Sequence, residues 1–119
     1  MKIPLFIFTL IFSLSSFACI NLKAVLNLNG KELFIDQKVD HDKTYSFMKD
    51  EYLVHVILPG RQPKNTHMAS FKIDRKLGQQ IERVAAPGIL VRNGHEAIVS
   101  VERNETKEKY EVKLTVKNI

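Results

Sequence analysis

The sequence predicts an all-β domain, a small antiparallel sandwich or partly open barrel of about seven or eight short strands after an N-terminal signal peptide. Three observations predict it. Apolar and polar residues alternate in several short segments, as in half-buried strands. Asn-Gly pairs at 29–30 and 93–94 separate such segments, as in hairpins with two-residue turns. The chain also begins with Met1 and Lys2 followed by a short apolar run, as signal peptides do.

The first 18 residues predict an export signal. One basic residue, Lys2, precedes an apolar run over residues 3–12, and a serine-rich stretch then reaches the small residue Ala18. A membrane-spanning helix would need about 20 mostly apolar residues. We therefore expect a signal peptide at 1–18, with an alternative end at 24, then a single β-domain at 19–119 and a periplasmic or secreted location.

Cys19 is the only cysteine, so no intramolecular disulfide is expected. A cut after Ala18 would make Cys19 the first residue, which resembles a bacterial lipoprotein and makes Cys19 a candidate for lipidation. Ser16 stands where such proteins usually carry leucine. A cut after Ala24 would remove the thiol instead.

Residues 24–36 predict the first hairpin, with its turn at 29–30. A two-residue turn fixes the register, and the register decides which side chains share a face. One face is aliphatic and the other is half solvated. The expected pairs are Leu28 with Lys31, Leu26 with Leu33 and Ala24 with Ile35 on the aliphatic face, and Asn27 with Glu32, Val25 with Phe34 and Lys23 with Asp36 on the other.

Further strands are expected at residues 44–48, 52–58, 68–75 and 110–116. Residues 52–58 are nearly all apolar, which is typical of a central strand covered on both faces. Residues 76–84 are ambiguous. Leu77, Ile81 and Val84 have the spacing of a short amphipathic helix, whereas Gly78 favours a turn followed by a strand. We favour the hairpin because Gly disfavours a helix interior.

Residues 87–103 predict a second hairpin around the Asn-Gly pair at 93–94. In that register both faces of the hairpin are apolar. Either both faces of this pair of strands are covered inside the sandwich, or one face is left exposed for another protein to bind. The candidate partner-binding residues are Ile89, Val91, Arg92, His95 and Ile98. The expected pairs are Arg92 with His95, Val91 with Glu96, Leu90 with Ala97 and Ile89 with Ile98.

The segment QQIERVAAPGILVRNGHEAIVSVE, residues 79–102, is similar to a β-hairpin segment of the secretin family of outer-membrane pore proteins. Its matching positions are Pro87, Asn93, Gly94, Glu96 and Ala97. The similarity covers about a fifth of the chain and implies a small β-domain of the bacterial envelope. It does not imply a channel, since the strands needed for a pore are missing.

No motif of an enzyme, cofactor or metal site is present, so we expect a non-enzymatic protein without cofactor or metal. A rival hypothesis is a small secreted enzyme or ligand-binding protein with a pocket near Asp40, His41 and His55. The net charge of +5 permits association with an anionic membrane surface. Glutamates alternate with Lys109, Lys113 and Lys117, and no nucleic-acid motif is found.

The leading interpretation is therefore a protein-binding or assembly module of the bacterial envelope. Its expected partner is another envelope protein, bound by an apolar hairpin face or by addition of a strand to an exposed sheet edge. A lipid-anchored surface protein, held through Cys19, is the third alternative.

Overall fold

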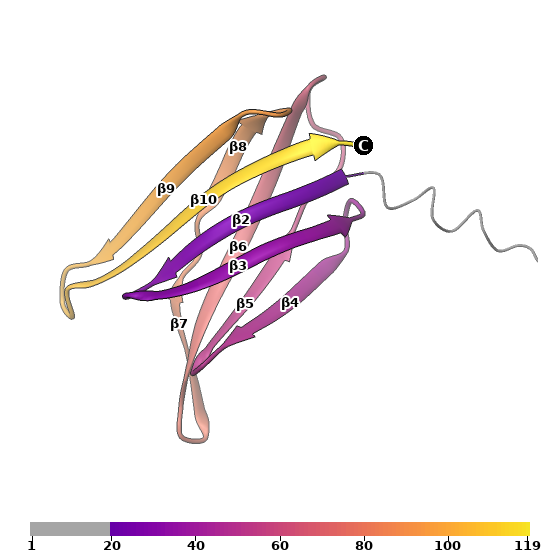
Figure 1. Cartoon of the computed structure of the whole chain (residues 1–119). Helices are drawn as coiled ribbons and strands as arrows, with labels where there is room; N and C mark the ends of the chain where they lie inside the picture. The colour runs from indigo at the N-terminus through magenta and orange to yellow at the C-terminus, as the bar shows by residue number, and fades with distance from the viewer. Residues whose placement is uncertain (1–19) are drawn as a thin grey trace, which may run out of the picture.

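Nine strands form two antiparallel sheets in the computed structural model, which describes residues 20–119 (Figure 1). This confirms the predicted all-β class. The predicted signal peptide at 1–18 and Cys19 lie outside the described residues. The alternative end of the signal peptide, at residue 24, falls inside strand Ile20–Leu28. A cut there would remove Ile20, Leu22 and Ala24 from the core. Within residues 20–119, no helix is long and apolar enough to cross a bilayer.

The first sheet has the strand order β3-β2-β10-β9. Its strands are β2 (Ile20–Leu28), β3 (Lys31–Val39), β9 (Glu96–Arg103) and β10 (Glu108–Asn118). The β2–β3 pairing has the register predicted from the turn at 29–30, with Leu26 opposite Leu33 and Val25 opposite Phe34. Strand β10 pairs with β2, so the first and last described strands lie side by side at the centre of the sheet.

The second sheet contains β4 (Thr44–Lys49), β5 (Tyr52–Ile57), β6 (Thr66–Leu77), β7 (Gln80–Ala85) and β8 (Gly88–Arg92). Strands β7 and β8 both pair with β6, one with each half of it. Between them, the carbonyl oxygen of Pro87 accepts a hydrogen bond from the Phe71 N–H (2.9 Å). The two strands therefore behave as one broken strand. Proline cannot donate to a ladder, which accounts for the break.

The hairpin interpretation of residues 76–84 is confirmed. Strand β6 runs to Leu77, Gly78 occupies the turn with a φ of +64°, and β7 returns along β6. Glycine adopts this left-handed conformation without the steric penalty of a Cβ atom. The alternative of an amphipathic helix in this segment is wrong.

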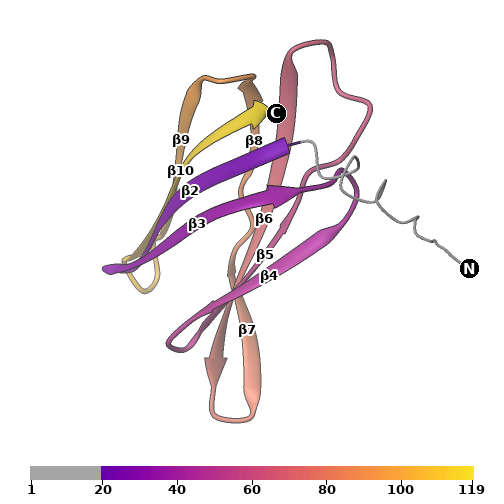
Figure 2. The same cartoon turned by 45° about the vertical axis from the view of Figure 1, so that its right-hand side comes forward.

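The predicted hairpin of residues 87–103 is wrong. Strand β8 pairs with β6 in the second sheet, whereas β9 pairs with β10 in the first. Asn93 and Gly94 form the corner where the chain crosses from one sheet to the other (Figure 2). The predicted pairs Ile89 with Ile98, Leu90 with Ala97 and Val91 with Glu96 are absent. The predicted contact between Arg92 and His95 is present as a hydrogen bond from the His95 N–H to the Arg92 carbonyl oxygen (2.9 Å).

A single core lies between the sheets. It is built from alternate residues of each strand, including Leu22 and Leu26 of β2, Val54 of β5, Phe71 of β6 and Leu114 of β10. Burying an aliphatic or aromatic side chain stabilises the fold by about 1.5–3 kcal/mol. The prediction that β5 is covered on both faces is wrong, because alternate residues of β5 are only half-buried on its outer face.

Candidate partner-binding surface

The five predicted partner-binding residues do not share one surface. Ile89 and Val91 point into the core and are only 7% and 4% exposed. Arg92 and His95 are exposed at the corner between β8 and β9. Ile98 is 58% exposed on the outer face of the first sheet. A partner can therefore contact Arg92, His95 and Ile98, but not Ile89 and Val91 in the folded protein.

A row of four side chains crosses the outer face of the first sheet. Strand pairing places Phe34 beside Val25, Val25 beside Lys113, and Lys113 beside Ile98. Phe34, at one edge, is 70% exposed. The methylene stem of a lysine is apolar, so this Phe34–Ile98 row presents apolar surface from edge to edge with one ammonium group in it.

A shallow groove of about 400 Å³ is lined by three members of this row, Phe34, Val25 and Lys113, and does not include Ile98. Its other charged lining residues are Lys23 and Asp36 on one side and Glu96 on the other. The Lys113 ammonium lies 3.8 Å from a carboxylate oxygen of Glu96. An apolar centre bordered by charges of both signs is the usual arrangement of a protein–protein interface.

The groove adjoins a free strand edge. Among residues 20–119, strand β3 is hydrogen-bonded only to β2, and Phe34 lies on β3 itself. The outer backbone groups of an edge strand can pair with an added strand. Glu32, Asp36 and Lys38 of β3 are exposed and oppose unspecific pairing by their charge.

The outer face of the second sheet has exposed apolar residues in a different arrangement. Met48 lies beside Leu53, but the next residue in this row is Asp74, which is ion-paired with Arg83. The residues that line a groove of about 240 Å³ on this face include Met48, Leu53, Asp74 and Ile81. The ion pair interrupts the apolar row, so this face offers a smaller continuous contact than the first sheet.

Ser46 and His55 pair on the same face, and Asp74 lies diagonally beside His55; sequence reasoning missed this group. The Ser46 hydroxyl oxygen lies 2.8 Å from His55 Nδ1, and His55 Nε2 lies 3.7 Å from Asp74 Oδ2. These residue types form hydrolytic triads. The second distance is too long for a hydrogen bond, and the groove that includes Asp74 does not include Ser46 or His55. The group is a surface contact rather than an enclosed reaction site.

Within residues 20–119, His41 and His55 of the predicted pocket lie on different faces of the second sheet. The His41 ring stacks on that of His67, at 6.3 Å between centroids and 19° between planes. His67 is buried among inward-facing residues of β6, whereas His55 is on the outer face of the sheet. Among residues 20–119, no group of three or more metal-ligating side chains was found.

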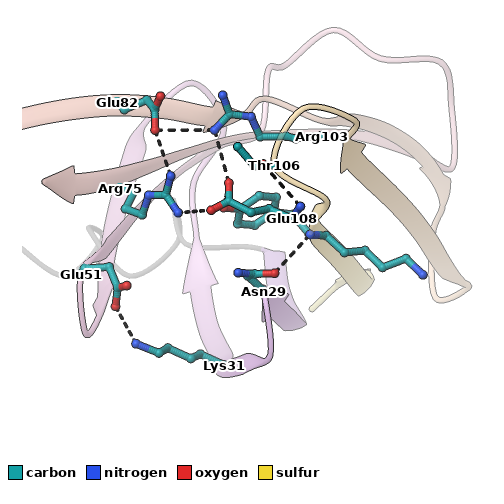
Figure 3. Close-up of polar contacts among 10 residues, drawn as sticks. Asn29, Lys31, Glu51, Arg75, Glu82, Arg103, Thr106 and Glu108 are labelled. Carbon is teal, nitrogen blue, oxygen red and sulfur yellow. Dashed lines mark hydrogen bonds and ion pairs between the residues drawn. The ribbon is translucent and has the colours of Figure 1, made fainter.

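Four charged side chains connect the two sheets at one end of the sandwich (Figure 3). Arg75 of β6 donates to Glu108 of β10, and its other terminal nitrogen lies 3.1 Å from Glu82 of β7. Arg103 of β9 lies 3.4 Å from Glu108 and 3.5 Å from Glu82. The Tyr110 hydroxyl donates to Glu108 (3.2 Å).

The ionisation of this charged cluster follows from its contacts. Burial acts to raise the pKa of Glu108, but hydrogen bonds from Arg75 and Thr106 lower it more, so the pKa lies below its usual value. The Glu108 hydrogen bond raises the pKa of Arg75. Burial raises the pKa of Tyr110. Both members of the Arg75–Glu108 pair are therefore charged at neutral pH, and the pair holds β10 against the second sheet.

A second ion pair links the sheets nearby. Lys31 of β3 lies 2.6 Å from Glu51 and 3.6 Å from Asp50, both in the turn between β4 and β5 (Figure 3). The hydrogen bond from Lys31 lowers the pKa of Glu51. Because both groups are exposed, this pair contributes little to stability.

Comparisons with protein-family models, with characterised proteins and with solved structures found no match to this chain. The similarity of residues 79–102 to a secretin segment stays a prediction.

Proposed function

We propose that this protein is a non-enzymatic binding module of the bacterial envelope, exported to the periplasm or secreted, which holds another envelope protein on the outer face of its first sheet. The observation that carries this proposal is the Phe34–Ile98 row, in which Phe34, Val25 and Lys113 line a groove of about 400 Å³ and Ile98 continues the row beside Lys113. Large aromatic side chains at the centre of an interface commonly supply much of the binding energy.

The adjoining edge of β3 supports a specific mode of binding. A partner in extended conformation would hydrogen-bond to the free edge of β3 and place an apolar side chain against Phe34. The exposed charges Lys23, Asp36 and Glu96 would select the partner through complementary charges at the rim. Strand addition to an exposed sheet edge is one of the two binding modes predicted from the sequence. The other predicted mode, binding by the apolar hairpin face, is replaced here by binding on the four-stranded face of the first sheet.

Site-specific cross-linking in the native envelope tests the proposal. A photo-reactive amino acid would replace Phe34 in one variant and Ile98 in another, and Lys72 on the second sheet would be the control position. We expect one dominant cross-linked protein from positions 34 and 98 and none from position 72. The same products from all three positions, or none from any, would contradict the proposed surface.

Substitutions then separate binding from folding. Phe34→Asp and Ile98→Asp should leave the protein folded and remove the cross-linked partner, because both side chains are exposed. Leu90→Asp is the matched control, since Leu90 is 61% exposed on the second sheet. Circular dichroism monitors folding. Retention of the partner by the Phe34 and Ile98 variants would rule out this face.

A further inference from the structure

One end of the first sheet carries three lysines on its outer face. Strand pairing places both Lys38 of β3 and Lys117 of β10 beside Asn21 of β2. Lys23 follows two residues later on β2 and is exposed on the same face. We call this group, Lys23, Lys38 and Lys117, the lysine end.

The charge of the lysine end is not neutralised by close ion pairs. Among residues 20–119, no carboxylate oxygen lies within 4.0 Å of any of these three ammonium groups. Asp36 lies beside Lys23 in the register, but its carboxylate accepts from the Asn21 amide (3.4 Å). A groove of about 380 Å³ is lined by the lysine end with Asn21, Thr115, Asn118 and Ile119, and no acidic side chain lines it.

The described chain begins at this same end. Strand β2 starts at Ile20, and it lies beside the final residues of β10 (Figures 1 and 2). The sequence before it contains the apolar run 3–12 and the lipidation candidate Cys19. Removal of the expected signal peptide after Ala18 would take the run 3–12 away and leave Cys19 next to β2, so a lipid on Cys19 would bring the lysine end against the lipid headgroups.

We propose that the lysine end docks on an anionic lipid surface. Each lysine close to such a surface strengthens binding by about fivefold, so the three together contribute on the order of a hundredfold. Ile119, which is exposed in the same groove, adds an apolar contact. A single acyl chain holds a protein on a membrane only marginally, and a basic patch provides the second contact that stable attachment needs.

This arrangement leaves the four side chains of the Phe34–Ile98 row available, although Lys23 borders both grooves. Phe34 and Ile98 lie further from the start of β2 than Asn21 and its lysine neighbours do. The membrane would contact the end of the sheet, while a partner protein occupied its face. The docking proposal therefore does not depend on the proposed function.

Vesicle co-sedimentation tests the lysine end with protein purified from its native envelope, so that the N-terminus is the natural one. The site variant is Lys23→Gln, Lys38→Gln and Lys117→Gln together. The control variant is Lys72→Gln, Lys76→Gln and Lys109→Gln, which removes the same charge from exposed lysines elsewhere. The vesicles contain phosphatidylglycerol and phosphatidylethanolamine in equal amounts, or phosphatidylcholine alone.

On the anionic vesicles we expect the site variant to bind about a hundredfold more weakly than the wild type, and the control variant to keep most of its affinity. On phosphatidylcholine the three proteins should bind equally. Equal losses in the two variants would overturn the proposal, since net charge and not the lysine end would then explain binding. Displacement by inorganic phosphate at constant ionic strength would also overturn it, because the groove would then hold a discrete phosphate.

Discussion

Arg75 on β6 donates a hydrogen bond to Glu108 on β10, and this pair joins the second sheet to the first where β9 turns into β10. Glu108 is 9% exposed, and it receives further contacts from Arg103 and Tyr110. Within residues 20–119 the two sheets share no backbone ladder, so they are joined by the core between them and by side-chain contacts such as this one.

Replacement of Glu108 by glutamine should destabilise the protein by about 2–3 kcal/mol, because it leaves the largely buried Arg75 guanidinium without its main carboxylate. Glu82→Gln should cost less than about 1 kcal/mol, since the Glu82 side chain is 41% exposed. Urea unfolding of both variants measures the difference. Equal losses would mean that the Arg75–Glu108 contact has no special weight.

Stability should decrease in acid because of Glu108. Its folded pKa is lower than the 4.5 of the free side chain, so its contribution is complete above pH 4.5 and is lost as the pH falls through the folded value. The difference in unfolding free energy between wild type and Glu108→Gln should therefore shrink below pH 4.5. A difference that stays constant across this range would show that ionisation of Glu108 does not stabilise the fold.

Ile89 and Ile98 should respond oppositely to truncation. Ile89→Ala removes part of a core side chain and should cost about 2–5 kcal/mol. Ile98→Ala changes an exposed side chain and should cost less than about 1 kcal/mol. Thermal or urea unfolding distinguishes them. A large loss of stability in Ile98→Ala would place that residue in the core and remove it from the binding surface.

Asn93 should fasten the end of β10 to the corner between the sheets. Its side-chain oxygen accepts from the Asn118 N–H (2.7 Å) and lies 3.1 Å from Nε2 of His67. Asn93→Ala should cost about 1–2 kcal/mol and speed hydrogen exchange at the Asn118 amide. Asn104→Ala, in the exposed turn before β10, is the control. Unchanged exchange at Asn118 would show that this bond does not hold the strand.

The turn chemistry predicted the β2–β3 hairpin and the turn at Gly78 because those interactions are local. Asn29 and Gly30 both have positive φ values, as a tight turn between adjacent strands requires. The pairing of Val25 with Phe34 follows from that turn alone. The turn predicted at residues 49–51 would have paired Ser46 with Val54, whereas the turn at residues 50–51 pairs Ser46 with His55.

The pair Asn93-Gly94 shows where local reasoning ends. Its letters match those of Asn29-Gly30, yet the strands beside it join different sheets. The apolar residues on both sides were correctly recognised, but they face one core from two sheets. Whether β8 and β9 pair with each other depends on the other strands available to them. In the structure β8 pairs with β6 and β9 pairs with β10.

The sequence by itself determined the all-β class, the positions of most strands and the inward and outward faces of the first hairpin, since alternation and turn residues act over a few positions. The tertiary structure alone decided that Ile89 is core while Ile98 is surface. It also decided that Lys38 and Lys117 meet across Asn21. The physical reason is that sheet order arises from pairing between distant strands, and the burial of a shared core selects that pairing.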